Sequence, residues 1–217
     1  MRIINHTDAS LKLGEEIISK IRMLIKQKGR ATVLLSGGNT PKKLYQYLER
    51  NLKNRELVTF GLVDERFVSL DHSKSNEKMI KDAFQNSIKL IGMVQQSDNY
   101  EQNLKLVNEQ YQRNFSEIDI CILGMGKDGH YASIFPNDKN STLAEVDQSP
   151  KLHNTSAPVS PENRITCNSV MLKKSNYKYL LILDKNKLDI VQSNEQILPI
   201  QRFLKNNPKT VVFYGRN

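Results

Sequence analysis

The sequence has little cysteine, since only Cys121 and Cys167 occur in 217 residues. The two residues form no Cys-x-x-Cys pair and show no metal-ligand spacing. Each lies within an apolar segment that is typical of a β-strand. We therefore expect two reduced thiols in the protein core, and neither a disulfide nor a redox centre.

Long apolar segments are also missing. No apolar run approaches the roughly 20 residues that a membrane-spanning helix needs. Near the start of the sequence, only Ile3 and Ile4 separate Arg2 from a polar stretch, so the apolar segment of a signal peptide is lacking. These absences predict a cytoplasmic protein without a membrane partner.

Basic residues are in excess, but they form no dense block. The 32 Lys and Arg residues outnumber the 23 Asp and Glu residues, and the formal net charge is +9. A positive field attracts anions, which suits an anionic small molecule as well as a nucleic acid. Because the basic residues are spread along the chain and no aromatic RNA-binding motif accompanies them, we expect solvated lysines and no nucleic-acid partner.

Strand-like and helix-like segments alternate along the chain. The first helix-like segment has apolar residues at helical spacing from Leu11 to Ile25, and Gly29 closes it. We expect strands at 2–5, 31–35, 58–63, 118–123, 164–167, 179–183 and 210–214, and helices at 10–28, 41–53, 75–84, 99–115, 187–192 and 199–206. This alternation predicts an α/β fold with a doubly wound, mainly parallel, Rossmann-like sheet and helices on both faces.

The domain organisation is expected to be simple. The chain has no internal repeat and no linker long enough to divide it, so residues 1–217 should form one domain. The stretch 137–161 is rich in Asn, Ser, Asp and Pro, which predicts a long surface loop. In a doubly wound sheet, ligands bind at the carboxyl ends of the strands. Three loops that follow predicted strands are therefore the candidates for function.

The first loop lies between a buried strand and an amphipathic helix. Its residues are Ser36, Gly37, Gly38, Asn39, Thr40 and Pro41. The glycines let the backbone approach an anion, and Pro41 suits the first turn of a helix. Free N–H groups at the helix start can hold phosphate or sugar oxygens. A plain tight turn capped by Thr40 is an equal alternative from this loop alone.

The second loop is a charged triplet, Asp64, Glu65 and Arg66, directly after the strand predicted at 58–63. At a strand end, Arg66 can bind an oxyanion, and Asp64 can bind a sugar hydroxyl or a catalytic proton. The alternative is a surface cluster of ion pairs. The position at the expected ligand crevice favours a functional role.

The third loop follows the strand predicted at 118–123 and runs from Gly124 to His130. Its glycines match G-x-G-x-x-G, a dinucleotide-binding pattern. That pattern also needs a full crossover helix and then a strand ending in an acidic residue, whereas Pro136 follows soon and no apolar strand precedes Glu145. We therefore expect no dinucleotide site in this loop.

His130 is the residue of the third loop that can carry chemistry. A neutral imidazole can take a proton from water near pH 7. A lone histidine usually has a structural role, but Asp128 lies two residues away and two other polar loops are expected at the same edge of the sheet. This setting favours His130 as a catalytic base.

Together, the three loops resemble the signatures of the 6-phosphogluconolactonases. The similar segments are Leu35–Pro41, Asp64–Val68 with Ser75 and Asn76, Gly124–Pro136, and Arg164–Thr166, in that order. They span most of the chain. The third segment is the most specific, whereas the first is shared with a sister family, the glucosamine-6-phosphate deaminases.

The resemblance implies hydrolysis of 6-phospho-D-glucono-1,5-lactone to 6-phosphogluconate in the oxidative pentose phosphate pathway. It implies His130 as the base that activates water, with Asp128 and Asp64 nearby and Arg66 in contact with substrate. Arg164 and Lys187 resemble the phosphate ligands of the family. The expected partner is a small phosphosugar lactone, and the expected assembly is a monomer or a weak homo-oligomer.

No metal or other cofactor is expected. Lactone hydrolysis needs a nucleophilic water, a base and stabilisation of an oxyanion, and the residues of the three loops can supply the last two. The histidines and carboxylates of the sequence show no recognisable ligand spacing.

The sequence departs from the family pattern at two places. Asp184 stands where the family usually has Gly, so the phosphate ligand is either Lys187 or Lys185. Tyr131 stands where the family most often has Thr, and the substrate fit would differ if this side chain lines the pocket.

Two rival functions remain open. In the deaminases, the segment after Gly-His typically ends in Glu-Pro, and the Glu serves the catalytic histidine, whereas Phe135 precedes Pro136 here. This difference favours the lactonase. A non-catalytic sugar-phosphate-binding regulator would keep the phosphate loops without needing His130, but no DNA-binding helix-turn-helix accompanies the domain.

Overall fold

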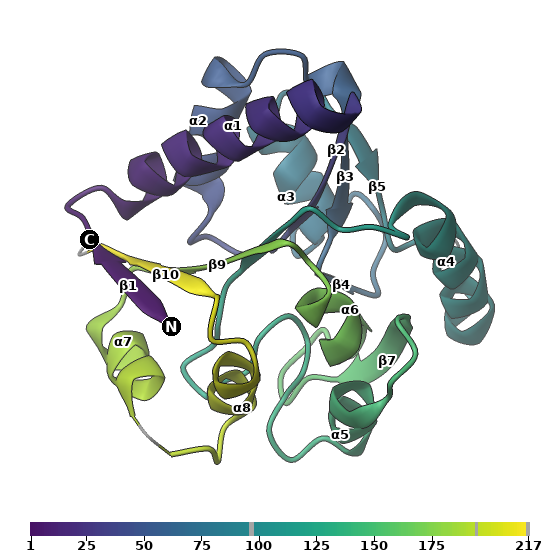
Figure 1. Ribbon diagram of the computed structural model, residues 1–217. Helices are drawn as coiled ribbons and strands as arrows, with labels where there is room; N and C mark the ends of the chain where they lie inside the picture. The colour runs from purple at the N-terminus through teal and green to yellow at the C-terminus, as the bar shows by residue number, and fades with distance from the viewer. Residues whose placement is uncertain (96–97, 194, 216–217) are drawn as a thin grey trace.

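A parallel sheet of seven strands forms the centre of the protein. The computed structural model describes residues 1–95, 98–193 and 195–215 (Figure 1). The strand order is β1-β10-β9-β6-β2-β3-β5, and each neighbouring pair is parallel. The strands are β1 (Arg2–Asn5), β2 (Ala31–Leu35), β3 (Val58–Leu62), β5 (Lys89–Ile91), β6 (Ile120–Leu123), β9 (Tyr177–Ile182) and β10 (Val211–Tyr214).

Helices cover both faces of this sheet, which confirms the predicted α/β fold class (Figure 1). One side carries α1 (Ala9–Lys28), α2 (Lys42–Asn51) and α3 (Asn76–Ala83), and the other carries α7 (Lys185–Gln192) and α8 (Pro199–Asn206). A short 3-10 helix (Arg55–Leu57) precedes β3. Helix α1 begins after Asp8, whose carboxylate accepts the N–H of Leu11, and ends at Gly29, whose φ of 76° suits glycine.

The strand order reverses next to β2. After β2, the chain continues through β3 and β5 on one side, and then through β6, β9 and β10 on the other side. All five residues of β2 are buried, as expected for a central parallel strand that is covered on both faces. A crevice forms where the connections from neighbouring strands leave in opposite directions. The fold thus places a crevice at the carboxyl ends of β2 and β6.

A second sheet of three antiparallel strands lies beside the first. It has the order β4-β8-β7, and its strands are β4 (Asp64–Arg66), β7 (Leu152–Ser156) and β8 (Asn163–Cys167). The strand predicted at 164–167 is therefore present, but it belongs to this antiparallel sheet and not to the parallel one. The register sets Arg66 opposite Arg164 and Asp64 opposite Thr166.

Three further helices accompany the second sheet, namely α4 (Tyr100–Asn114), α5 (Lys139–Val146) and α6 (Ser169–Lys173). The prediction of a long loop over 137–161 was wrong, because α5 and β7 lie within this stretch. Asp138 starts α5 by accepting the N–H of Ser141, and Ser141 and Ala144 are buried. Single buried residues in a polar segment give little hydrophobic periodicity, so neither element was expected. The short elements β4, β5 and α6 were missed as well.

Both cysteines are free thiols in the core, as predicted. Burial raises the pKa of Cys121 to about 12.

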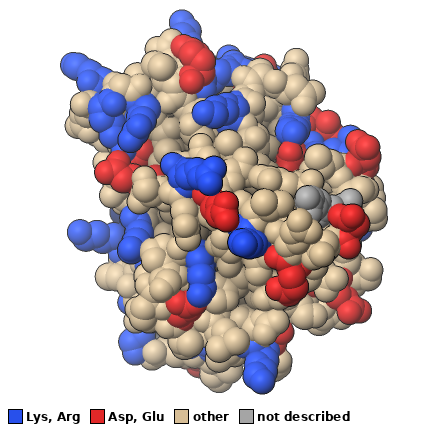
Figure 2. All heavy atoms as spheres, turned by 90° about the vertical axis from the view of Figure 1, so that its right-hand side faces the viewer, with Lys and Arg blue, Asp and Glu red and all other residues tan. Residues whose placement is uncertain are grey.

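In the described parts of the chain, no helix is both long and apolar enough to cross a membrane. Basic and acidic side chains lie interspersed over the face seen in Figure 2.

Candidate active site

A cavity of about 260 Å³ lies at the carboxyl ends of β2, β3 and β6. All three loops singled out in the sequence contribute to its wall. Among the predicted site residues, those that line it are Ser36, Gly37, Gly38, Asn39, Thr40, Asp64, Arg66, His130 and Lys187. Ser36 Oγ is buried and has no hydrogen-bond partner among the described residues. The cavity therefore offers at least one hydroxyl that is available to a ligand.

His130 and Asp128 form a pair at this cavity. His130 Nδ1 lies 2.6 Å from Asp128 Oδ1. Burial is the largest single influence and acts against ionisation of the carboxyl, but the hydrogen bonds of the carboxylate and its electrostatic attraction to His130 together outweigh burial and lower the pKa of Asp128. An ionised carboxylate can only accept a hydrogen bond, so Nδ1 carries the proton and Nε2 is left as the acceptor. Gly126 is required here, because a Cβ at this position would overlap both paired atoms.

Arg164 does not line this cavity in the described structure. Its side chain is buried, and Nε donates a hydrogen bond to the carbonyl of Pro161 at 2.8 Å. The guanidinium lies 5.8 Å from the ring centre of Phe135, and that ring lies 4.6 Å from the ring of His130. Burial lowers the pKa of Arg164, and the charge of Arg66 adds to this effect. The role of Arg164 as a phosphate ligand stays a prediction.

Asp64 is held in place by the loop that follows β6. Its Oδ2 accepts a hydrogen bond from Ser133 Oγ at 2.6 Å, and the Ser133 N–H donates to Thr166 Oγ1 at 3.1 Å. Asp64 is buried and lines the cavity. These contacts fix its carboxylate relative to the loop that carries His130.

Glu65 is fully buried directly behind the cavity wall. Its carboxylate accepts hydrogen bonds from the backbone N–H groups of Arg66, Asn76 and Glu77, each at 2.7 Å, and from Ser75 Oγ at 3.2 Å. Burial raises the pKa of Glu65 to about 7, although the three N–H donors favour the ionised form. Glu65 thereby joins β4 to the start of α3.

Asn76 connects two walls of the cavity. Its Nδ2 donates to the carbonyl of Asp64 at 2.9 Å, and its side chain lies so close to Gly37 that a Cβ there would overlap Oδ1. Neither Asn76 nor Glu65 was expected to have a role from the sequence alone. The only signal for Asn76 was its place after Ser75 in a segment that resembles the lactonases.

Lys187 lies in the first turn of α7 and lines the cavity. Burial lowers its pKa. Lys185 instead forms an exposed ion pair with Asp189. Of the two lysines left open by the sequence, the structure places Lys187 at the cavity.

Tyr131 lies outside the cavity. Its side chain is fully buried, and its ring centre lies 4.6 Å from that of Phe203. The residue does not belong to the cavity lining in the described structure. The possibility that Tyr131 shapes the substrate pocket therefore finds no support in its position.

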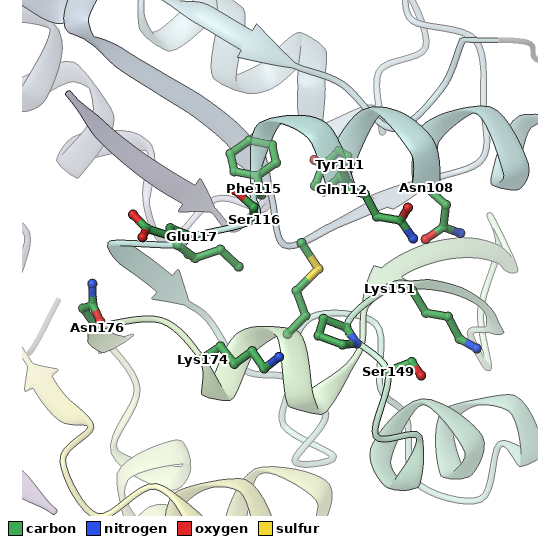
Figure 3. Close-up of a pocket in the computed structure, with 13 residues that line it drawn as sticks. Asn108, Tyr111, Gln112, Phe115, Ser116, Glu117, Ser149, Lys151, Lys174 and Asn176 are labelled. Carbon is green, nitrogen blue, oxygen red and sulfur yellow. The ribbon is translucent and has the colours of Figure 1, made fainter.

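A larger hollow of about 660 Å³ lies elsewhere, between α4, α6 and the segment that leads into β6 (Figure 3). Tyr111, Phe115, Ile118 and Met171 contribute apolar surface to it. Its lining contains no histidine and none of the predicted site residues. The smaller cavity combines a histidine pair with polar loops at the strand ends, so it is the better candidate for chemistry.

The described residues, 1–95, 98–193 and 195–215, contain no group of three His, Cys, Asp or Glu side chains that could hold a metal ion.

The fold and the cavity define an α/β protein with a polar, histidine-containing site at its topological switch point. Comparison with known proteins narrows this class. A family profile described as glucosamine-6-phosphate isomerases/6-phosphogluconolactonase matches residues 5–212. The chain belongs to this family.

Individual relatives are named as lactonases. A 6-phosphogluconolactonase of Thermotoga maritima is 31% identical over 219 residues, covering 93% of this chain and 92% of that protein. A 6-phosphogluconolactonase of Pseudomonas aeruginosa is 27% identical over 212 residues, covering 93% of this chain and 89% of that protein. The crystal structure of a 6-phosphogluconolactonase from Shewanella baltica matches with a TM-score of 0.89 at 27% identity, covering 99% of this chain and 96% of that one.

Proposed function

We propose that this protein hydrolyses 6-phospho-D-glucono-1,5-lactone to 6-phosphogluconate, with His130 as the general base. The observation that carries the proposal is the pairing of His130 with Asp128 at a cavity where three strand-end loops meet. Similarity along nearly the whole chain to proteins named 6-phosphogluconolactonase supports the choice of substrate.

The reaction can be written with the residues of this cavity. Water attacks the lactone carbonyl carbon while Nε2 of His130 takes one of its protons. The resulting oxyanion collapses, the bond between that carbon and the ring oxygen breaks, and the proton passes from His130 to the ring oxygen, which becomes a hydroxyl. Asp128 holds the imidazole through Nδ1 and stabilises its protonated form between these two transfers.

Other residues of the cavity wall can stabilise the negative charge of the oxyanion and of the substrate phosphate. Arg66 and Lys187 are cations on the cavity wall, so they can bind the oxyanion and the phosphate of the substrate. Backbone N–H groups of the turn from Ser36 to Thr40 add neutral donors. Asp64 accepts a hydrogen bond from Ser133 and keeps its second oxygen for a sugar hydroxyl.

Phe135 supports a lactonase rather than a deaminase. Its ring lies against His130, at the place where the sequence comparison expects the glutamate of the deaminases. Asp128 is the carboxylate that contacts His130 in the described structure. The site thus provides one carboxylate for orientation of the base and an apolar surface where a second proton carrier would have to lie.

A coupled assay tests the proposed function. Purified protein should accelerate conversion of 6-phosphogluconolactone to 6-phosphogluconate, as measured by NADPH formation with excess 6-phosphogluconate dehydrogenase and corrected for spontaneous hydrolysis. Parallel incubation with glucosamine 6-phosphate should release no ammonia. Ammonia release without lactonase activity would overturn the assignment, and loss of both activities would favour a binding protein.

We also propose that the enzyme works in the cytoplasm, as a monomer or a weak homo-oligomer. The two buried free thiols are compatible with a reducing compartment. Gel filtration with light scattering at several protein concentrations would measure the mass directly.

A further inference from the structure

A second hollow of about 470 Å³ adjoins the candidate active site. The two share Gly38, Asn39, Arg66 and Asn76 in their walls, so they form one continuous depression. The outer part lies between the first turns of α2 and the whole length of α3 with the residues just before it. A ligand in the outer hollow would therefore touch groups that also face the catalytic cavity.

The outer hollow is strongly basic. Lys42, Lys74 and Lys78 line it together with Arg66, while Asp82 is its one acidic lining residue. Asp82 pairs with Lys78 at 3.4 Å. Neither Lys42 nor Lys74 has an ion-pair partner among the described residues, and the buried Arg66 Nε has no hydrogen-bond partner there. Positive charge thus remains uncompensated on this wall.

The single phosphate of the proposed substrate does not need the positive charge of Lys42 and Lys74. A lactone monophosphate carries one phosphate group, and the cavity beside His130 already has Lys187 and Arg66 to receive it. The two lysines of the outer wall lie beyond that cavity's lining. Cations in a hollow of this kind raise the local concentration of anions and bind multiply charged ones best.

We propose that the outer hollow is a second anion subsite that takes compact, multiply phosphorylated molecules and makes them competitive inhibitors of the enzyme. The claim of inhibition rests on the proposed lactonase function. The claim that the hollow binds such anions does not. An oligophosphate would place one phosphate near Arg66 and Asn39 and the others toward Lys42 and Lys74. Because Arg66 and Asn39 also line the catalytic cavity, the anion and the substrate exclude one another.

Inorganic tripolyphosphate is a suitable probe, because it supplies the charge without a sugar. Calorimetric titration at low ionic strength should show one binding site in the wild-type protein, and binding should weaken as salt is added. The double variant Lys42→Ala/Lys74→Ala should bind about tenfold more weakly, which corresponds to about 1.4 kcal/mol. Lys26→Ala/Lys105→Ala removes two exposed lysines from α1 and α4 as a matched control and should bind like the wild type.

Kinetics separates the new subsite from the phosphate site of the substrate. Tripolyphosphate should compete with the lactone, and the ratio of its inhibition constant to KM should rise about tenfold in the Lys42→Ala/Lys74→Ala variant. An unchanged ratio with both constants raised would mean that the substrate phosphate itself occupies the hollow, and this would overturn the proposal. Equal binding by the two double variants would also overturn it. If the wild type lacked lactonase activity, the calorimetric comparison would still decide the binding claim.

Discussion

Glu65 accepts the backbone N–H of Asn76 at 2.7 Å, and this hydrogen bond joins the strand that carries Asp64 and Arg66 to the start of α3. The carboxylate does not line the cavity, so Glu65 acts through its neighbours as a positioning residue. Buried polar groups that meet several donors specify one local geometry, because any displacement leaves a donor unsatisfied.

Replacing Glu65 by Gln should reduce kcat/KM by about tenfold or more, in a protein that still folds. The NH₂ of the amide replaces one of the two carboxylate oxygens, so it opposes the N–H of either Asn76 or Glu77, and the start of α3 must shift away from β4. Exposed Glu56→Gln is the matched control and should behave like the wild type. Steady-state kinetics checks the prediction, which fails if Glu65→Gln keeps wild-type kcat and KM.

The contribution of Glu65 to the stability of the protein should decrease as the pH rises, which is the reverse of the usual behaviour of a carboxyl group. Its pKa is raised from 4.5 to about 7 by burial, so the folded state holds a proton that the unfolded state has lost between these values. The contribution to stability is present below about pH 4.5 and disappears as the pH rises through 7. The stability advantage of the wild type over Glu65→Gln should therefore be larger at pH 5 than at pH 8, by up to about 3 kcal/mol.

Urea unfolding of both proteins at pH 5 and pH 8 measures this difference. A larger advantage at pH 8 would mean that the three backbone N–H donors outweigh burial and that the carboxylate stays ionised. Comparing the two proteins at each pH removes the effect of the other titrating groups, since both proteins carry them.

The sequence indicated where the active site would lie, but not how its walls are joined. The loops at Ser36, Asp64 and Gly124 could be predicted because each follows an apolar strand segment, and parallel strands end at a common edge. The contact between Asn76 and Gly37 could not, since it depends on the packing of α3 against the turn after β2. Antiparallel pairing of β4 with β8 was equally hidden, because a three-residue strand has no measurable periodicity.

Gly37→Ala should lower both stability and activity. The added methyl group would overlap Asn76 Oδ1, so this side chain must leave its place beside Asp64. Gly124→Ala is the matched comparison, because a Cβ there meets only Ser36 Oγ at 3.7 Å, an ordinary contact. Thermal unfolding should show a larger decrease in Tm for Gly37→Ala than for Gly124→Ala. Equal decreases would contradict the claim that overlap with Asn76 causes the destabilisation.

Lys187→Ala should raise KM by about tenfold with a smaller change in kcat. A phosphate contact exists in both the ground state and the transition state, so its loss weakens binding of both. Lys185→Ala removes the neighbouring lysine, which pairs with Asp189 at the surface, and should leave KM unchanged. If Lys185→Ala raised KM and Lys187→Ala did not, the phosphate ligand would be the other lysine.

The lactonase activity of His130→Asn tests most directly whether His130 is the general base. Asparagine keeps some hydrogen bonding toward Asp128 but cannot take a proton from water, so kcat should fall by about 10²–10⁴-fold while KM changes little. His6→Asn alters an exposed histidine and controls for loss of an imidazole. Rates must be taken above spontaneous hydrolysis, and circular dichroism must show that the variant is folded. A folded His130→Asn protein with near-wild-type kcat would contradict the assignment of His130 as the base.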